Sequence, residues 1–564
     1  MLRLVGILVY AAVSSLAQQT GEHPDWPRWC GKVYKSGYPS FNPGGQTVEP
    51  PVSPDAPLLY VQLKPRYSLY LDGEAKGQFV VNAGLSQHFG EPFPSSSASR
   101  LDFSIKIAST GEKLVESHVD VGKTGALFSF DLASLKPQLE AHEVTFEGSL
   151  QGHARGYTAT TELFYLPDKS SGSVTKLDNL NGGMLFRNGA SGNKFRPLLP
   201  YGYYASYDGF LGKNDTGEIQ KYADYGLNAM TPLTTFPVST DAFAYMDKID
   251  LPWMYDLRDG YKNLTWVEEE VLKARDGEAI FSYWSADEPD GWQDPFNSTT
   301  LALDTIRRLD PYHPVAVVLN CQDYYFGPYS AGADIIMEDV YPIGTNQSWS
   351  KWNTTCNTTI GDCGCDNCRD GVHVVQNVGN RLDDLSKYEE WLGRWPKTKI
   401  HNPQSFHGEG YWARDPTPEE EWAMNLLALN HGAQGVISWV YPAAEILSQA
   451  HGKLAKVITK SPVLDFVVGG DRPHRVKVSA NEDVDVSFWK LGNRMLVSLV
   501  NSGYSDVNGP VEIAVPDAAS IEATVWGGLS WSVEGGKLSV PGVAALETAM
   551  VIVKLSCVRR GPLI

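Results

Sequence analysis

Three carboxylates stand where acid/base chemistry could take place, each shortly after a short apolar run in the middle of the chain. They are Glu288, Glu338 and Glu409. Two carboxyl groups that face one site can divide the work of breaking a bond: one donates a proton to the leaving oxygen, and the other attacks or stabilises the positive centre. Glu288 is the candidate proton donor, because the adjacent carboxylate of Asp287 disfavours a second negative charge beside it.

Either of the other two could be the second catalytic carboxylate. Glu338 follows the apolar residues 335–337, and Tyr341 after it is typical of the rim of a site, which favours a catalytic role over a structural ion pair. Glu409 could fold back towards the site or remain a solvated loop residue. We therefore expect Glu338 to be the partner and keep Glu409 as the alternative.

Aromatic and polar side chains follow the same apolar runs and could bind a substrate. Aromatic rings offer apolar faces for stacking, and amide, carboxylate and guanidinium groups can form hydrogen bonds with hydroxyl groups. The spacing of His, Asp and Glu indicates no metal set, and no cofactor is expected. The candidate binding residues are Tyr203, Asp256, Arg258, Trp284, Asp287, Asn320, Tyr341, Gln404, His407, Trp412 and Trp439.

The elements that must position these residues form a repeating pattern. From Phe195 onwards, short apolar runs alternate with helical stretches about eight times, which predicts a (β/α)8 TIM barrel over residues 191–468. Thr417, Pro418 and Glu420 form a capping box at the start of the seventh helix. An open doubly wound sheet is the alternative, but no glycine-rich phosphate loop follows the first strand. In a barrel, the ends of the strands converge on one site.

The residues on both sides of the barrel alternate between apolar and polar types with a period of two. This pattern predicts an N-terminal β-sandwich over 58–167 and a C-terminal β-sandwich over 469–557. Residues 18–57 are rich in Pro and Gly and should form an extended arm. Residues 168–190 should form a linker.

The segment from Trp284 to Pro289 resembles the Asn-Glu-Pro acid/base motif of clan A glycoside hydrolases, and Trp439 is similar to the tryptophan on the floor of their substrate site. The likeness covers most of the chain as architecture, but its motifs are short. It implies a TIM-barrel hydrolase that cleaves an O-glycosidic bond in an extracellular poly- or oligosaccharide. The sequence departs from the clan pattern twice: Asp287 replaces the Asn, and Gln404 stands in place of the nucleophile.

These departures leave two other functions open. The consecutive Asp287 and Glu288 also resemble the pair of hexosaminidase-type barrels, in which an acetamido group of the substrate attacks and the Asp orients it. Gln404 would instead fit a non-catalytic barrel that binds carbohydrate. A protease or esterase lacks a recognisable nucleophile motif here.

The start of the chain predicts secretion. Residues 1–17 have the apolar run and small-residue end of a signal peptide, and neither this run nor any other is long enough for a membrane span. The formal net charge of −19 and the lack of a basic run argue against binding to nucleic acid. N-glycosylation is expected at Asn214, Asn263, Asn297, Asn346, Asn353 and Asn357, and disulfides, rather than zinc, among Cys356, Cys363, Cys365 and Cys368.

Overall fold

The computed structural model describes most of the chain. The described residues are 26, 28–33, 48–54, 56–94, 99–153, 155–346, 370–406, 412–478, 481–515 and 517–556. Several predictions lie outside these residues: the signal peptide 1–17, most of the arm, the four clustered cysteines, Asn353, Asn357, His407 and Glu409.

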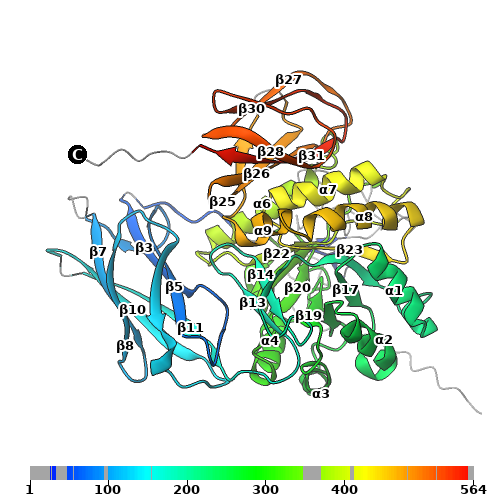
Figure 1. Cartoon of the computed structure of the whole chain (residues 1–564). Coiled ribbons are helices and arrows are strands. Elements are labelled where there is room, and N and C mark those ends of the chain that lie inside the picture. The colour runs from blue at the N-terminus through cyan, green and yellow to red at the C-terminus, as the bar shows by residue number, and fades with distance from the viewer. Residues whose placement is uncertain are drawn as a thin grey trace, which may run out of the picture.

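Eight parallel strands close into a barrel at the centre of the molecule, so the predicted TIM barrel is confirmed (Figure 1). Neighbouring strands pair in chain order, and the last pairs with the first. Each predicted strand is present. They are β16 (Tyr201–Ala205), β17 (Ala229–Pro232), β18 (Trp253–Asp256), β19 (Ile280–Asp287), β20 (Val315–Leu319), β21 (Ile335–Glu338), β22 (Thr398–His401) and β23 (Val436–Tyr441).

Helices follow the strands and cover the barrel. The predicted capping box begins α7: the Thr417 side chain accepts a hydrogen bond from Glu420 N, and the Glu420 carboxylate accepts one from Thr417 N. The helices are α1 (Thr216–Asp224), α2 (Phe236–Lys248), α3 (Leu264–Ala274), α4 (Ser298–Leu309), α5 (Phe326–Ala331), α6 (Asn377–Trp391), α7 (Pro418–Asn430), α8 (Glu445–Ile458) and α9 (Val463–Gly469), with 3-10 turns η1 (Leu132–Ser134) and η2 (Leu211–Lys213).

Alternate side chains of each barrel strand face opposite ways. Tyr204, Trp284 and Met337 belong to the hydrophobic cluster inside the barrel. Tyr203 and Ile336, their neighbours in β16 and β21, pack instead with the surrounding helices. A shift of one residue therefore decides whether a side chain at a strand end faces the barrel mouth or the outer layer.

Residues 168–190, which the sequence predicts as a linker, contain strands that pack against the barrel. These residues form β13 (Val174–Leu177) and β14 (Met184–Arg187), which pair with β15 (Arg196–Leu198) in an antiparallel sheet. Leu177, Met184 and Phe186 pack into the cluster inside the barrel. Their apolar side chains close its amino-terminal end, which explains why these residues form strands and not a plain linker.

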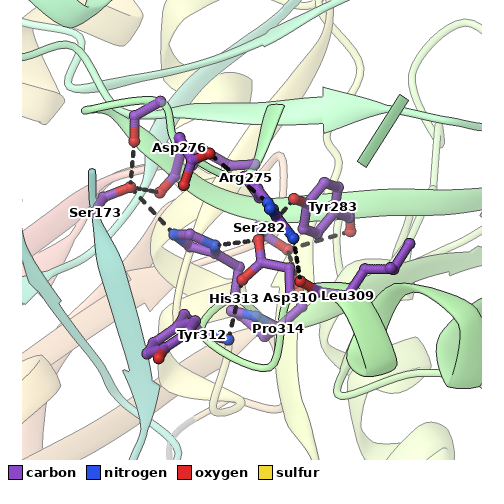
Figure 2. Close-up of polar contacts among 12 residues, drawn as sticks. Ser173, Arg275, Asp276, Ser282, Tyr283, Leu309, Asp310, Tyr312, His313 and Pro314 are labelled. Carbon is purple, nitrogen blue, oxygen red and sulfur yellow. Dashed lines mark hydrogen bonds and ion pairs between the residues drawn. The ribbon is translucent and has the colours of Figure 1, made fainter. Parts of the chain in front are cut away.

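A buried polar network joins this sheet to the barrel (Figure 2). Ser173 Oγ lies 3.1 Å from His313 Nε2, and His313 Nδ1 lies 2.7 Å from Asp310 Oδ2. The order of the three side chains matches that of a hydrolase triad. Ser173 is, however, fully buried and donates to the carbonyl oxygen of Ile280, at the amino end of β19. The network therefore lies at the amino-terminal end of the barrel, where side chains stabilise the fold, and not at the carboxyl ends of the strands, where barrel enzymes carry their active site.

Residues on each side of the barrel form antiparallel sheets, with the N-terminal sheets beside the barrel and the C-terminal sheets next to α7 and α9 (Figure 1). Two four-stranded sheets share one core over 58–163: β6-β3-β5-β9 and β11-β10-β7-β8. After the barrel, the sheets β24-β25-β26-β31-β28 and β27-β30-β29 share another. The bounds are β1 (Arg28–Trp29), β2 (Lys32–Val33), β3 (Leu58–Pro65), β4 (Tyr70–Leu71), β5 (Lys76–Ser86), β6 (Glu91–Pro92), β7 (Arg100–Ile107), β8 (Lys113–Asp120), β9 (Ala126–Asp131), β10 (His142–Leu150), β11 (Gly156–Leu163), β12 (Tyr165–Leu166), β24 (His474–Lys477), β25 (Val484–Leu491), β26 (Arg494–Asn501), β27 (Val507–Ala514), β28 (Ala518–Trp526), β29 (Ser532–Glu534), β30 (Lys537–Val543) and β31 (Thr548–Leu555).

Among the described residues, no helix has both the length and the apolar character needed to cross a bilayer.

Candidate active site

A cavity of about 170 Å³ opens at the carboxyl ends of the barrel strands. Such ends carry the active site in barrel enzymes, because the loops that follow the strands surround a shared hollow. The wall combines three carboxyl groups with six aromatic rings. Its lining residues are Tyr204, Trp284, Asp287, Glu288, Val318, Asp339, Tyr341, Asn402, Phe406, Trp412 and Trp439.

Glu288 and Asp339 form a carboxyl pair in this cavity. Asn320 Nδ2 lies 3.3 Å from Glu288 Oε1 and 3.4 Å from Asp339 Oδ1, so one amide contacts both groups. Besides burial, the charge of the Glu288 carboxyl raises the pKa of Asp339. Two carboxyl groups this close to one amide disfavour a double negative charge, which favours a pair that shares one proton.

The surroundings favour the proton on Asp339. Burial raises the pKa of the Asp339 carboxyl well above its usual range, and the neighbouring Glu288 carboxyl raises it further. Asp339 is almost fully buried, whereas Glu288 is only half-buried. Asp339 is therefore placed to act as an acid and Glu288 as the carboxylate.

Asp287 adds a third carboxyl group to the same wall. Burial raises its pKa well above the usual range and Glu288 adds to this, while the cation of Arg258 opposes both. Arg258 Nη1 lies 3.8 Å from Asp287 Oδ2, and its Nε lies 3.4 Å from Asp256 Oδ2. Burial also raises the pKa of Asp256 to about 7. This arrangement places a cation beside Asp287 and Asp256, where it limits the negative charge on that side of the cavity.

The backbone holds Glu288 in an uncommon conformation. Its φ is 46°, in the left-handed region that residues with a Cβ rarely adopt. Glu288 N donates to Val318 O at 3.1 Å, which ties this turn to β20. Strain of this kind persists only where the surrounding structure enforces it, and it is concentrated at functional sites.

Aromatic rings make up most of the remaining wall. The ring centroids of Tyr204 and Trp284 lie 4.7 Å apart, and the Arg258 guanidinium lies 4.7 Å from the Trp284 ring. Across the cavity, Trp412 Nε1 donates to Tyr341 O at 2.9 Å. Rings held in this way offer rigid apolar faces to a bound molecule.

Six of the predicted residues line the cavity: Trp284, Asp287, Glu288, Tyr341, Trp412 and Trp439. Asn320, Asp256 and Arg258 form the layer behind it through the contacts described above. Three predicted residues need correction. Glu338 is fully buried against His401 Nδ1, Tyr203 is fully buried near Ser405, and Gln404 holds the backbone of Ile343 through two hydrogen bonds of 3.0 Å. None of these three lines the cavity.

Two of these corrections have the same cause. Glu338 and Tyr203 face the outer layer, whereas their neighbours Asp339 and Tyr204 face the barrel mouth. Once one inward residue of β21 is known, the alternation along the strand finds Asp339, since Ile335 and Met337 share its inward parity. Asn402, Phe406 and Val318 were also missed. Asn402 and Val318 share such a signal, from the inward Ile400 and Ala316.

A disulfide joins Cys30 to Cys321, a pairing that the sequence did not suggest. It fastens the described part of the N-terminal arm beside Asn320. Within the described ranges, no group of three His, Cys, Asp or Glu side chains is arranged to hold a metal ion.

No protein-family model and no curated protein matches the chain. Among solved structures, it is similar to an FMN-binding beta-glucuronidase from Facaelibacterium prausnitzii L2-6, with 12% identity over 88% of this chain and 70% of that one and a TM-score of 0.34. A GH30 endoxylanase from Clostridium papyrosolvens C71 matches at 12% identity over 63% and 96%, with a TM-score of 0.38. AmyP in complex with maltose matches at 11% over 63% and 96%, with a TM-score of 0.40. At these low identities and TM-scores, the matches show neither the family nor the function of this chain.

Proposed function

We propose that this chain is a glycoside hydrolase whose catalytic groups are Glu288 and Asp339. The observation that carries the proposal is the placement of both carboxyl groups against one Asn320 amide, inside a cavity lined with aromatic rings. Hydrolysis of a glycosidic bond needs an acid for the leaving oxygen and a carboxylate for the anomeric carbon. The pair supplies both. Because the clan-like motif contains Glu288, the proposal keeps that residue and replaces Glu338 with Asp339.

The protonation of the pair assigns the roles. Asp339 donates its proton to the glycosidic oxygen as the bond to the anomeric carbon breaks, and the Glu288 carboxylate attacks that carbon. A water molecule then gives a proton to Asp339 and displaces Glu288, which restores both groups. Glu288 thus acts as the nucleophile and not as the acid that the sequence suggested, since burial favours the proton on Asp339.

The spacing of the pair predicts retention of the anomeric configuration. Inverting enzymes keep their carboxyl groups roughly 6.5–9.5 Å apart, which leaves room for a water molecule between them. Here one oxygen of each group lies within 3.4 Å of the same amide nitrogen. This close spacing favours direct attack by Glu288 over attack by a water molecule held between the two groups.

The substrate would be a neutral sugar bound by its faces and hydroxyl groups. Trp284, Trp412 and Trp439 offer stacking surfaces, and Asp287 and Arg258 can bind hydroxyl groups. We place the substrate outside the cell, as part of an extracellular poly- or oligosaccharide. The side chains of four predicted glycosylation sites are exposed, which supports N-glycosylation of a secreted chain: Asn214, Asn263, Asn297 and Asn346. We also interpret the two pairs of sheets that flank the barrel as β-sandwiches.

One observation favours a second candidate. Asp287 lines the cavity next to Glu288, as required if the acetamido group of an N-acetylhexosamine attacks its own anomeric carbon and Asp287 orients it. The non-catalytic barrel loses its main support, because Gln404 secures a loop and Asp339 supplies the second carboxyl group.

The test compares three variants on a panel of 4-nitrophenyl glycosides that includes N-acetylglucosaminide. We expect Glu288→Ala to lose activity on the best substrate and to regain part of it with azide, because the small anion replaces the nucleophile. In a substrate-assisted enzyme, Asp287→Asn would lose activity on the N-acetylhexosaminide alone, and azide would not restore Glu288→Ala. Full activity of Glu288→Ala and Asp339→Asn would refute the proposal.

A further inference from the structure

The N-terminal hairpin formed by residues 28–33 reaches the site from nearly 300 residues away. The Cys30–Cys321 disulfide spans 291 positions of the sequence and ends directly beside Asn320. Trp29 Nε1 donates a hydrogen bond to Asn320 Oδ1 at 3.3 Å. The hairpin therefore holds the oxygen of the same amide whose nitrogen contacts Glu288 and Asp339.

Packing fixes the hairpin in place. Trp29 is 5% exposed and, with Cys30, belongs to the apolar cluster that includes Tyr341 and Trp412 of the cavity wall. The ring of Trp29 covers Gly291 so closely that a Cβ there would lie 2.4 Å from it. Trp29 thus occupies a formed socket.

The backbone of Asn320 is held separately. Asp290 accepts hydrogen bonds from Asn320 N at 3.3 Å and from Cys321 N at 2.8 Å. The position of the residue is thereby set, but a rotation of its side-chain amide by 180° would still exchange oxygen and nitrogen. A rotated amide would point its oxygen at the negative charge of the pair. The indole N–H of Trp29 opposes this rotation, because a donor must face the oxygen.

We infer that Trp29, fastened by the Cys30–Cys321 disulfide, is a positioning residue that keeps the Asn320 N–H groups directed at the Glu288–Asp339 pair. This inference rests on the proposed function. The amide N–H stabilises the single negative charge of the pair. Without Trp29, that charge is less stable, so the pair loses its first proton at a higher pH and fewer molecules are active in acid.

The experiment uses Trp29→Phe, which keeps a ring in the socket and removes the N–H. On the best 4-nitrophenyl glycoside, we expect kcat to fall about fivefold, the size of one lost hydrogen bond, with KM unchanged. The acid limb of the kcat/KM profile should move to higher pH. Trp292→Phe is the matched control: Trp292 is 67% exposed and its ring centroid lies 4.8 Å from that of Trp29, but no hydrogen bond among the described residues joins it to Asn320, so its profile should match wild type.

A second variant, Cys30→Ser/Cys321→Ser, removes the disulfide and should move the acid limb in the same direction. Combined with Trp29→Phe, it should add little, because both changes release the same amide. This variant decides the question if Trp29→Phe does not fold. An acid limb that stays at the wild-type pH in the folded variants would overturn the inference. Loss of activity in Glu288→Ala and Asp339→Asn would still uphold the proposed function in that case.

Discussion

Asp339 and Glu338 are adjacent in the chain, and exchanging each carboxyl group for an amide should give opposite results. Asp339 faces the cavity with Glu288, whereas Glu338 faces the outer layer and is paired with His401. Asp339→Asn removes the proposed acid. General acid catalysis contributes about 10²- to 10⁴-fold, so kcat/KM should fall by that factor, or about 3–5 kcal/mol in the barrier.

The stability of the two variants should change in opposite directions as well. The pKa of Asp339 is raised in the folded protein, so the tendency of this carboxyl group to ionise at neutral pH lowers the free energy of unfolding. Asp339→Asn should therefore unfold at the same or a higher temperature than wild type. Glu338→Gln weakens a fully buried polar pair and should cost about 1–3 kcal/mol of unfolding free energy, while kcat/KM stays within about threefold.

The assay measures kcat/KM on an alkyl glycoside of the best sugar, whose leaving oxygen needs the proton of the acid, and unfolding by urea with circular dichroism, on the same preparations. Far-ultraviolet spectra that match wild type show that each variant is folded. A folded Glu338→Gln variant as inactive as Asp339→Asn would refute the assignment of side chains to the two faces of β21. So would an active Asp339→Asn.

Three other measurements test further parts of the structure. Proton NMR of the first sugar product should show the anomer of the substrate, whereas the opposite anomer would exclude attack by Glu288. The folded protein binds a proton on Asp256 that the unfolded chain has released between pH 3.8 and about 7, so this group should lower stability as pH rises through that window, and Asp256→Asn should flatten the dependence seen in urea titrations. Gln404→Ala should lower the melting temperature, because the backbone N–H and C=O of Ile343 lose their partners, and should change KM more than it changes the acid limb.

The sequence by itself determined the architecture of the barrel and the neighbourhood of the site. Eight apolar runs separated by helical stretches suffice for a closed barrel, since each run can bury itself only against its neighbours. The Thr417–Glu420 capping box could be predicted from the sequence, because it depends only on residues that are close together in the chain. Trp284 lies in the last half of β19 and Glu288 directly follows this strand, and a closed barrel brings the carboxyl ends of all its strands together.

Only the tertiary structure decided which neighbour faces the cavity and what lies behind it. Strand parity depends on where pairing begins, and register shifts such as the one between Trp284 and Ala286 in β19 alter it without a mark in the sequence. The Cys30–Cys321 bond and the contact of Trp29 with Asn320 join segments about 290 residues apart. Local pattern carries no information about such contacts, because they form only after the hairpin meets the folded barrel.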